Sequence, residues 1–246
     1  MKNNFRLVLL TLSVFFVLNA CKKSSSSTPA TPPPIKNNLV YIYKNDSTDG
    51  VSFENLLKLN GCTVTLINKS AAAALDYSSY SMIIIGGNSD TLKSHDNWDT
   101  AAANKIKNSG KPCLLIGEGG LLFGGAIGDT VAWLQSAGNF LTGFKAIDPT
   151  SSLYKQPNVI SVPADSTITL YSAASEVGSF YLKAPPLANV TLLARETGVA
   201  ASKYYPMTID NVKYATFGYY DNMDKMTAGG KAFFVNLVYF AGNLTQ

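Results

Sequence analysis

The run Gly117-Glu118-Gly119-Gly120 holds the residues of this chain with the clearest potential for chemistry. It follows an apolar segment, and glycines let a ligand approach the backbone closely. Glu118 could act as a general acid or base, and the three glycine N–H groups could hold an anion. Two other interpretations remain open: Glu118 could stabilise a helix N-terminus, and the glycines could only permit a tight turn. The run is neither a dinucleotide fingerprint nor a P-loop, because the third fingerprint glycine and a Gly-Lys-Ser/Thr sequence are missing.

Tyrosines and aspartates are the next candidates. Four tyrosines in two adjacent pairs could stack on sugar rings, although tyrosine is also a common strand residue. Four aspartates in two clusters could bind calcium, but neither cluster has the EF-hand spacing, so we expect solvated turn acids and no metal site. The tyrosines are Tyr204, Tyr205, Tyr219 and Tyr220. The aspartates are Asp46, Asp49, Asp221 and Asp224.

Cysteine and histidine are scarce. The only histidine is His95, in a polar segment, which disfavours Ser-His-Asp hydrolysis and histidine-ligated metal catalysis. Cys62 and Cys113 each open a predicted buried strand, and the expected topology does not make these strands neighbours. We therefore expect two buried free thiols rather than a disulfide. We also expect no cofactor.

The third cysteine, Cys21, belongs to a signal sequence. Lys2 and Arg6 precede an apolar run at 7–18 that is too short to span a bilayer, and Leu-Asn-Ala-Cys at 18–21 resembles a bacterial lipobox. Residues 1–20 are thus predicted to be a lipoprotein signal peptide. Cys21 is predicted to carry fatty acyl chains, palmitate among them. The alternative is an ordinary signal peptide followed by a chance cysteine. Its lipid would anchor the protein in the cell envelope, at the outer membrane. The sequence does not indicate whether the domain lies on the periplasmic or the external face.

Residues 21–38 read as a disordered Ser/Pro-rich tether, and residues 39–246 as a single domain. The whole chain has a net charge of +4, with 20 basic and 16 acidic residues. Five of the basic residues precede residue 38, where no acid occurs, which leaves 15 basic and 16 acidic residues in the domain. The basic balance therefore belongs to the signal and tether and gives no reason to expect nucleic-acid binding.

Apolar strands alternate with amphipathic helices in the first half of the domain. Strands are predicted at 39–43, 62–67, 82–85 and 113–116, with a polar turn at 44–50. One helix follows the first strand, and a second presents Trp98, Ala101, Ala102 and Ile106 on one face. This alternation predicts an α/β fold with a parallel sheet covered on both sides.

The second half has a different pattern. Asp129 is expected to cap a helix through Val131, Trp133 and Leu134. Residues 144–195 form a β-rich excursion at the sheet edge, with short strands near 159–162, 167–171 and 190–193. A strand at 212–220 and a helix at 227–242 complete the domain, the helix with Phe233, Phe234, Leu237, Val238 and Ala241 facing inward.

Ligands usually bind outside the carboxyl ends of the strands in such a sheet. Four segments should converge there, at 45–50, 86–90, 117–120 and 219–224. The predicted ligand-binding residues are Gly86, Gly87, Asn88, Gly117, Glu118, Gly119, Gly120, Tyr219, Tyr220 and Asp221.

Three junctions together resemble the class I glutamine amidotransferase-like superfamily, which includes the DJ-1/PfpI and ThuA-like proteins. They are a strand ending in Gly-Gly at 80–87, a proline-led strand and glycine-containing turn at 112–120, and a late strand at 214–221 followed by Thr-x-x-Gly at 227–230. The resemblance implies a three-layer α/β/α, flavodoxin-like fold. It also places the nucleophilic cysteine of the family on Gly117, and the family's catalytic histidine has no counterpart in the late junction.

Glycine cannot supply a thiolate, so the resemblance implies a degenerate catalytic site. We expect a lipid-anchored envelope protein whose domain binds a glycan, a metabolite or a protein partner without catalysis. The alternative is an envelope hydrolase that uses Glu118 as general acid or base, helped by Asp221 or a tyrosine, on carbohydrate. A purely structural module is the third possibility.

Overall fold

The computed structural model describes residues 37–91, 98–129, 131, 139–182, 187–198 and 203–245. The predicted signal peptide, Cys21, the tether up to residue 36, His95, Trp133 and Leu134 lie outside the described residues. Among the described helices, none is both long and apolar enough to cross a membrane.

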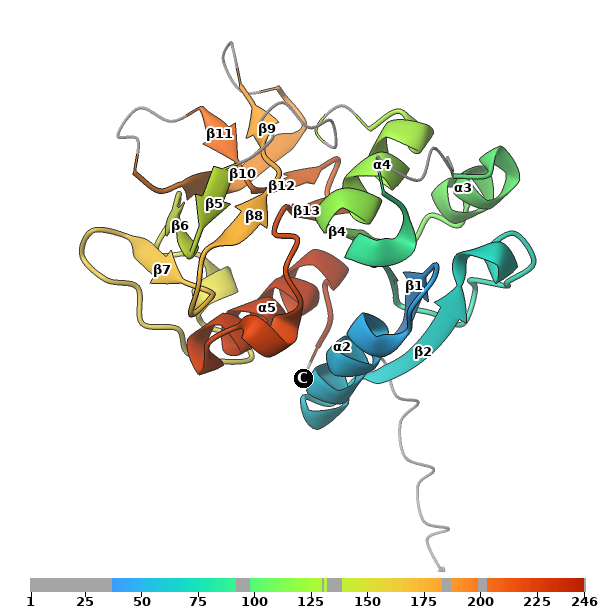
Figure 1. Ribbon diagram of the computed structural model, residues 1–246, viewed down its shortest axis with the longest axis horizontal. Coiled ribbons are helices and arrows are strands. Elements are labelled where there is room, and N and C mark those ends of the chain that lie inside the picture. The colour runs from blue at the N-terminus through green and yellow to red at the C-terminus, as the bar shows by residue number, and fades with distance from the viewer. Residues whose placement is uncertain are drawn as a thin grey trace, which may run out of the picture. The chain divides into compact units, whose positions relative to one another are not determined.

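The first half of the domain alternates strands and helices as the sequence predicts (Figure 1). The expected polar turn at 44–50 is partly wrong, because α2 already begins at Thr48 and carries Asp49 in its first turn. The elements are β1 (Asn38–Tyr43), α2 (Thr48–Leu59), β2 (Thr63–Asn68), η1 (Lys69–Ala71), β3 (Met82–Ile85), η2 (Gly87–Ser89), α3 (Thr100–Asn108), β4 (Cys113–Ile116) and α4 (Gly117–Ile127).

The second half adds mostly short strands. They are β5 (Asn139–Leu141), β6 (Gly143–Ala146), β7 (Thr167–Thr169), β8 (Ser175–Val177), β9 (Phe180–Tyr181), β10 (Val190–Glu196), β11 (Tyr204–Tyr205), β12 (Met207–Asp210) and β13 (Tyr214–Phe217). The helical segments here are η3 (Ser152–Tyr154), η4 (Met223–Lys225) and α5 (Ala228–Gly242). The strand predicted at 159–162 does not form; Pro157 and Pro163 flank it, and proline cannot donate a ladder hydrogen bond.

The described strands form one main sheet in the order β2-β1-β3-β4-β13-β12-β10-β6-β7. The pairs from β2 to β13 are parallel, and those from β13 to β7 are antiparallel. The β-rich excursion therefore extends the main sheet, and only the pairs β5–β8 and β9–β11 stand apart from it. The result is the expected α/β flavodoxin-like fold with extra strands.

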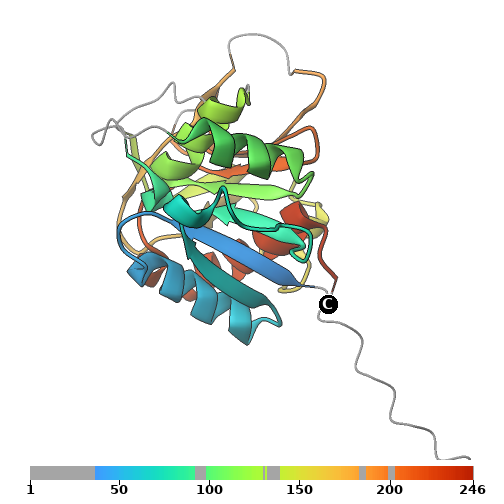
Figure 2. The same cartoon turned by 90° about the vertical axis from the view of Figure 1, so that its right-hand side faces the viewer.

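Helices cover both faces of the parallel half. Figure 2 shows α3 and α4 on one side of the sheet and α2 and α5 on the other. The five α5 residues predicted to face inward are all buried. On α3 the inward face is Ala102, Ala103 and Ile106, whereas Ala101 is exposed and Trp98 is buried just before the helix begins.

Both described cysteines are free and buried, as predicted. Cys62 precedes β2 and Cys113 begins β4, and strands β1 and β3 lie between them in the sheet. Burial raises the pKa of the Cys113 thiol to about 12, so this thiol is protonated and unreactive at neutral pH.

Candidate functional site

The glycine run at 117–120 is the first turn of α4 and not a separate turn before a helix. Gly117 joins β4 to this helix with a φ of 51°, a conformation that glycine adopts without strain. A Cβ atom on Gly119 would lie 2.7 Å from Gly87 O and would also meet Gly86 O and Ser89 Oγ. Close packing of α4 on the end of β3 thus accounts for the glycines, so their presence alone no longer argues for an anion site.

The space beside Gly117 is occupied by the chain that follows β13. A Cβ atom at position 117 would lie 3.1 Å from Tyr219 O and 3.3 Å from Tyr220 Cδ1. A side chain here would be strained by the positive φ, and Tyr219 and Tyr220 would have to shift by a few tenths of an ångström to accommodate it. The position where the resemblance places a nucleophile therefore carries no side chain, and its surroundings are tightly packed.

Glu118 lies half-buried in the first turn of α4, where an acid is favourable to the helix dipole. Its neighbours include Tyr220, whose pKa is raised by burial and further by Glu118 and Glu176. Glu176, on β8, was missed at the sequence level because nothing in its local pattern connects it with α4. The backbone N–H of Tyr220 donates to Glu176 O at 3.0 Å, which fixes β8 beside the site.

The four predicted segments do converge at the carboxyl edge of the sheet. Asn88 Nδ2 donates to the Asp46 carbonyl oxygen at 2.6 Å, which connects the ends of β1 and β3. Asn222 Nδ2 donates to Asp49 Oδ1, and Ser52 Oγ donates to Asp224 Oδ2 at 3.0 Å, so the loop after β13 is held on the start of α2. The Gly117 contacts with Tyr219 and Tyr220 complete the junction.

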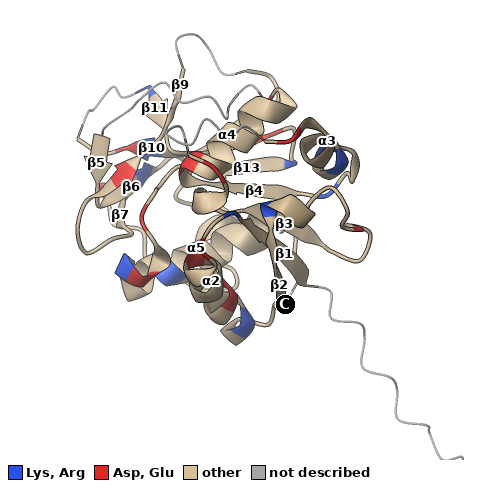
Figure 3. Ribbon diagram, turned by 45° about the vertical axis from the view of Figure 1, so that its right-hand side comes forward, with Lys and Arg blue, Asp and Glu red and all other residues tan. Residues whose placement is uncertain are grey.

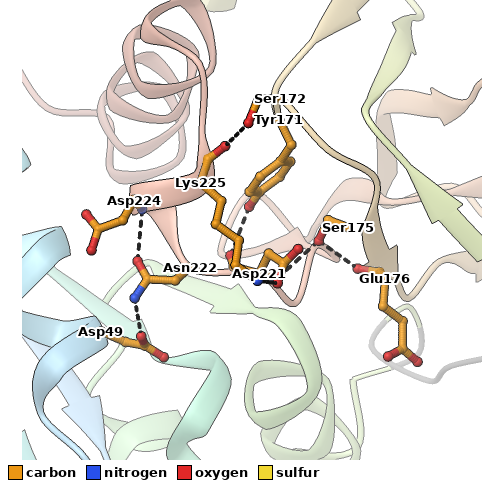
Figure 4. A network of polar contacts seen from close by, with 9 residues as sticks. All are labelled: Asp49, Tyr171, Ser172, Ser175, Glu176, Asp221, Asn222, Asp224 and Lys225. Atoms are coloured by element: carbon orange, nitrogen blue, oxygen red, sulfur yellow. Dashed lines mark hydrogen bonds and ion pairs between the residues drawn. The ribbon is translucent and has the colours of Figure 1, made fainter.

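Asp221 helps to hold this loop in place (Figure 4). Its carboxylate accepts from Lys225 Nζ at 2.6 Å, its N–H donates to Ser175 Oγ at 3.1 Å, and its carbonyl accepts from Tyr171 Oη at 3.0 Å. These contacts give Asp221 a structural role, and its carboxylate is partly exposed at the edge.

The two tyrosine pairs do not form one platform. Tyr219 is completely buried, with its ring centroid 5.4 Å from Tyr171 and 5.3 Å from Phe217, so the prediction that it stacks on a ligand is wrong. Tyr204 packs on Tyr181 in the separate β9–β11 pair, at 5.0 Å. Of the predicted tyrosines, Tyr220 is the one that is both at the carboxyl edge and partly exposed.

The aspartates at this edge differ in environment. Asp46 is exposed, and hydrogen bonds from Thr48 lower its pKa. Asp49 is half-buried, and its pKa is raised by burial and then by Asp46, so it is not the solvated turn acid that we expected. Within the described residues, no group of three or more acids, cysteines or histidines is placed to hold a metal ion.

A neighbouring part of the edge places two lysines around one buried aspartate. Asp90 is buried and pairs with Lys69 at 2.7 Å and with Lys44 at 4.0 Å. The Lys69 ammonium also lies 4.8 Å from the centre of the Trp98 ring. Figure 3 marks the charged positions along the ribbon. Both lysines of this part are thus engaged with Asp90.

Comparison with solved structures supports the fold. The chain superimposes on a GMP synthase-type protein from Thermoplasma acidophilum with a TM-score of 0.57 and 11% identity, over 84% of this chain and 95% of that one. It superimposes on a glutamine amidotransferase from Thermotoga maritima with a TM-score of 0.51 and 9% identity, over 84% and 98% of the two chains. No protein-family model and no curated protein sequence matches the chain. At these identities the likeness establishes a glutamine amidotransferase-like fold and does not extend to activity.

Proposed function

We propose that this chain is a lipid-anchored protein of the cell envelope whose amidotransferase-like domain binds a ligand at the carboxyl edge of its sheet and has no glutaminase activity. The observation that carries the proposal is the strand–helix junction at Gly117. Glutaminase chemistry at such a junction needs a thiolate, and Gly117 has no side chain to supply one. The convergence of four loop segments around this junction supports retention of the edge as a binding surface.

The lack of glutaminase activity is tested with the purified full chain and a coupled assay for ammonia release from glutamine. We expect no release by the wild type and none by Gly117→Cys, because the new thiol would press on Tyr220 and the chain's single histidine is far away in sequence. Ammonia release by the wild type would refute this part of the proposal.

The lipid anchor rests on the sequence at 18–21. Growth with an alkyne-labelled palmitate should label the wild type, and Cys21→Ala should abolish both the label and recovery in the membrane fraction. The matched control is Cys62→Ala, which removes a buried thiol and should leave labelling unchanged. Unlabelled wild type in membrane fractions would contradict acylation at Cys21.

One observation favours the hydrolase alternative. Glu118 and Glu176 each act electrostatically on Tyr220, so two carboxyl groups have this tyrosine as a common neighbour. Paired carboxyl groups hydrolyse glycosidic bonds. A panel of nitrophenyl glycosides tests this function: hydrolysis that is lost in both Glu118→Gln and Glu176→Gln would replace the non-catalytic proposal.

A further inference from the structure

A pocket of about 390 Å³ lies outside the carboxyl ends of β1 and β2. Its lining includes Lys44 and Asn45, which follow β1, and Asn68 and Lys69, where β2 passes into η1. The start of α3 adds Asp99. Pockets that hold small molecules in proteins have volumes of about 300–1,000 Å³, so this one is large enough for a small metabolite.

The order of the strands changes direction at this pocket. The chain passes from β1 to β2 on one side and then returns to place β3 on the other side of β1. In open α/β sheets, ligands bind at such a point, outside the carboxyl ends of the strands. Residues 117–120 follow β4 and do not line the pocket. The pocket is therefore separate from the junction where the resemblance places a nucleophile.

Two lysine side chains line the pocket, and one buried carboxylate holds both. Lys69 Nζ donates to Asp90 Oδ2 at 2.7 Å, and Lys44 Nζ lies 4.0 Å from Asp90 Oδ1. The Lys69 ammonium also lies 4.8 Å from the centre of the Trp98 ring. These contacts fix both ammonium groups close together, so a ligand that binds them does not have to order two long side chains.

The asparagine at the end of β2 fixes the neighbouring wall. Asn68 Nδ2 donates to the Lys44 carbonyl oxygen, which joins the loop after β1 to the end of β2. Asn68 Oδ1 accepts from the Ser70 N–H at 3.0 Å and from Ser70 Oγ at 2.8 Å. Asn45 and Asp99 are exposed parts of the lining, and Asp99 Oδ2 caps α3. The groups around the lysines thus suit the hydroxyl groups of a ligand better than a second negative charge.

We propose that this pocket binds a monosaccharide-sized ligand with one anionic group, which the ammonium groups of Lys44 and Lys69 hold. Hydroxyl groups of the ligand contact the side chains of Asn45, Ser70 and Asp99. This inference rests on the proposed function and names the place and the chemical class of its ligand. Ammonium groups form charge-assisted hydrogen bonds with carboxylates and phosphates, and these are stronger than hydrogen bonds between neutral groups.

A sugar acid and a sugar phosphate share this chemistry, and the experiment separates them. The purified full chain is titrated calorimetrically with glucuronate, glucose 6-phosphate, glucose and inorganic phosphate. We expect glucuronate or glucose 6-phosphate, or both, to bind about tenfold or more tightly than glucose, which lacks the charge. Inorganic phosphate should bind more weakly than the charged sugars, because it lacks the sugar hydroxyls.

A charge variant tests the role of the lysines. Lys44→Gln keeps the shorter ion pair between Lys69 and Asp90, so the buried carboxylate retains its nearest cation. It should weaken binding of the charged sugar about tenfold and leave binding of glucose unchanged. Lys58→Gln is the matched control, since it removes the same charge from α2, where Lys58 pairs with Glu54, and it should bind as the wild type does.

A second variant fills the pocket and keeps its charges. Ala73 is part of the lining, and Ala73→Phe should abolish binding of every sugar while both lysines remain. Thermal denaturation checks that the variants are folded. If the charged sugar binds equally well to the wild type, to Lys44→Gln and to Ala73→Phe, this pocket is not its site and the inference is wrong, whereas ligand binding elsewhere at the edge survives.

The remaining outcomes also decide. If glucose binds as tightly as both charged sugars, or inorganic phosphate binds as tightly as they do, recognition of an anionic sugar is wrong. If none of the four compounds binds at millimolar concentration, the inference is wrong as well. Ammonia release from glutamine would instead refute the non-catalytic function, whatever the sugars do.

Discussion

Two groups of aspartates lie at opposite ends of the sheet and differ in what surrounds them. At the amino ends of β4 and β13, Asp129 and Asp210 are only 9% and 5% exposed. Burial, and then a hydrogen bond and repulsion from Asp210, raise the pKa of Asp129 to about 7. At the carboxyl edge, Asp49 is half-buried and its amide neighbour Asn222 reaches it from another loop.

The comparison shows that the degree of burial determines whether a pair of acids contributes to stability or is available to a ligand. The amino-end aspartates are almost completely buried, so Asp129 meets the cost of burial by holding a proton in a hydrogen bond with Asp210. The carboxyl-edge acids keep access to solvent, so their charge can be resolved by a ligand. We therefore expect the first pair to govern stability and the second to contribute little to it.

The largest expected effect is on the pH dependence of stability. The folded pKa of Asp129 is raised above the value of 3.8 for a free aspartate, so its contribution is complete below about pH 4 and is lost as pH rises through 7. The free energy of unfolding should therefore be about 2–3 kcal/mol higher at pH 5 than at pH 8. Urea denaturation at the two pH values measures it, and Asp129→Asn should flatten the difference. If the free energy of unfolding depended equally on pH in the wild type and in Asp129→Asn, Asp129 would not be the group responsible. The two ends of the sheet would then not differ as we expect.

A smaller effect is expected from the strained turn beside the amino-end pair. Val212 lies between β12 and β13 with a φ of 56°, which a β-branched residue rarely adopts, and its side chain is 86% exposed. Val212→Asn should raise the free energy of unfolding by about 1 kcal/mol, because asparagine tolerates this conformation. Val212→Thr, which is also β-branched, is the control and should show no gain in thermal denaturation. A gain in both variants would mean that lost hydrophobic exposure, and not backbone strain, is responsible.

The smallest effect is expected at the carboxyl edge. Asp49→Asn should change the free energy of unfolding by less than about 1 kcal/mol, since one hydrogen bond with Asn222 is weakened while repulsion from Asp46 is relieved. Chemical denaturation at pH 7 measures it, with Glu54→Gln as the control on the same helix. A loss of several kcal/mol would show that this acid is structural and would contradict the contrast between the two ends of the sheet.

Local pattern predicted the parallel half of the sheet well. Strands buried on both faces need continuous apolar runs, and β1, β3 and β4 are such runs bounded by polar residues, proline or glycine. At α4 the pattern left two interpretations open, and the structure bears out the helix N-terminus at Glu118. Gly-Glu-Gly-Gly has low helix propensity, and packing against the end of β3 makes the helix favourable. The pattern failed at β12, which is short and gains its partners from β10 and β13.

The sequence by itself determined the class of fold, the meeting of four loop segments at one edge of the sheet, and the lack of a thiol at position 117, because each follows from local composition and from the rule that parallel strands end on the same side. Only the tertiary structure decided which of those residues remain accessible. Tyr219 is sealed, Tyr41 is left with an unsatisfied hydroxyl, and Glu176 is brought beside Tyr220. The burial of a side chain and its distance from others depend on contacts with many segments of the chain. No single stretch of sequence therefore determines them.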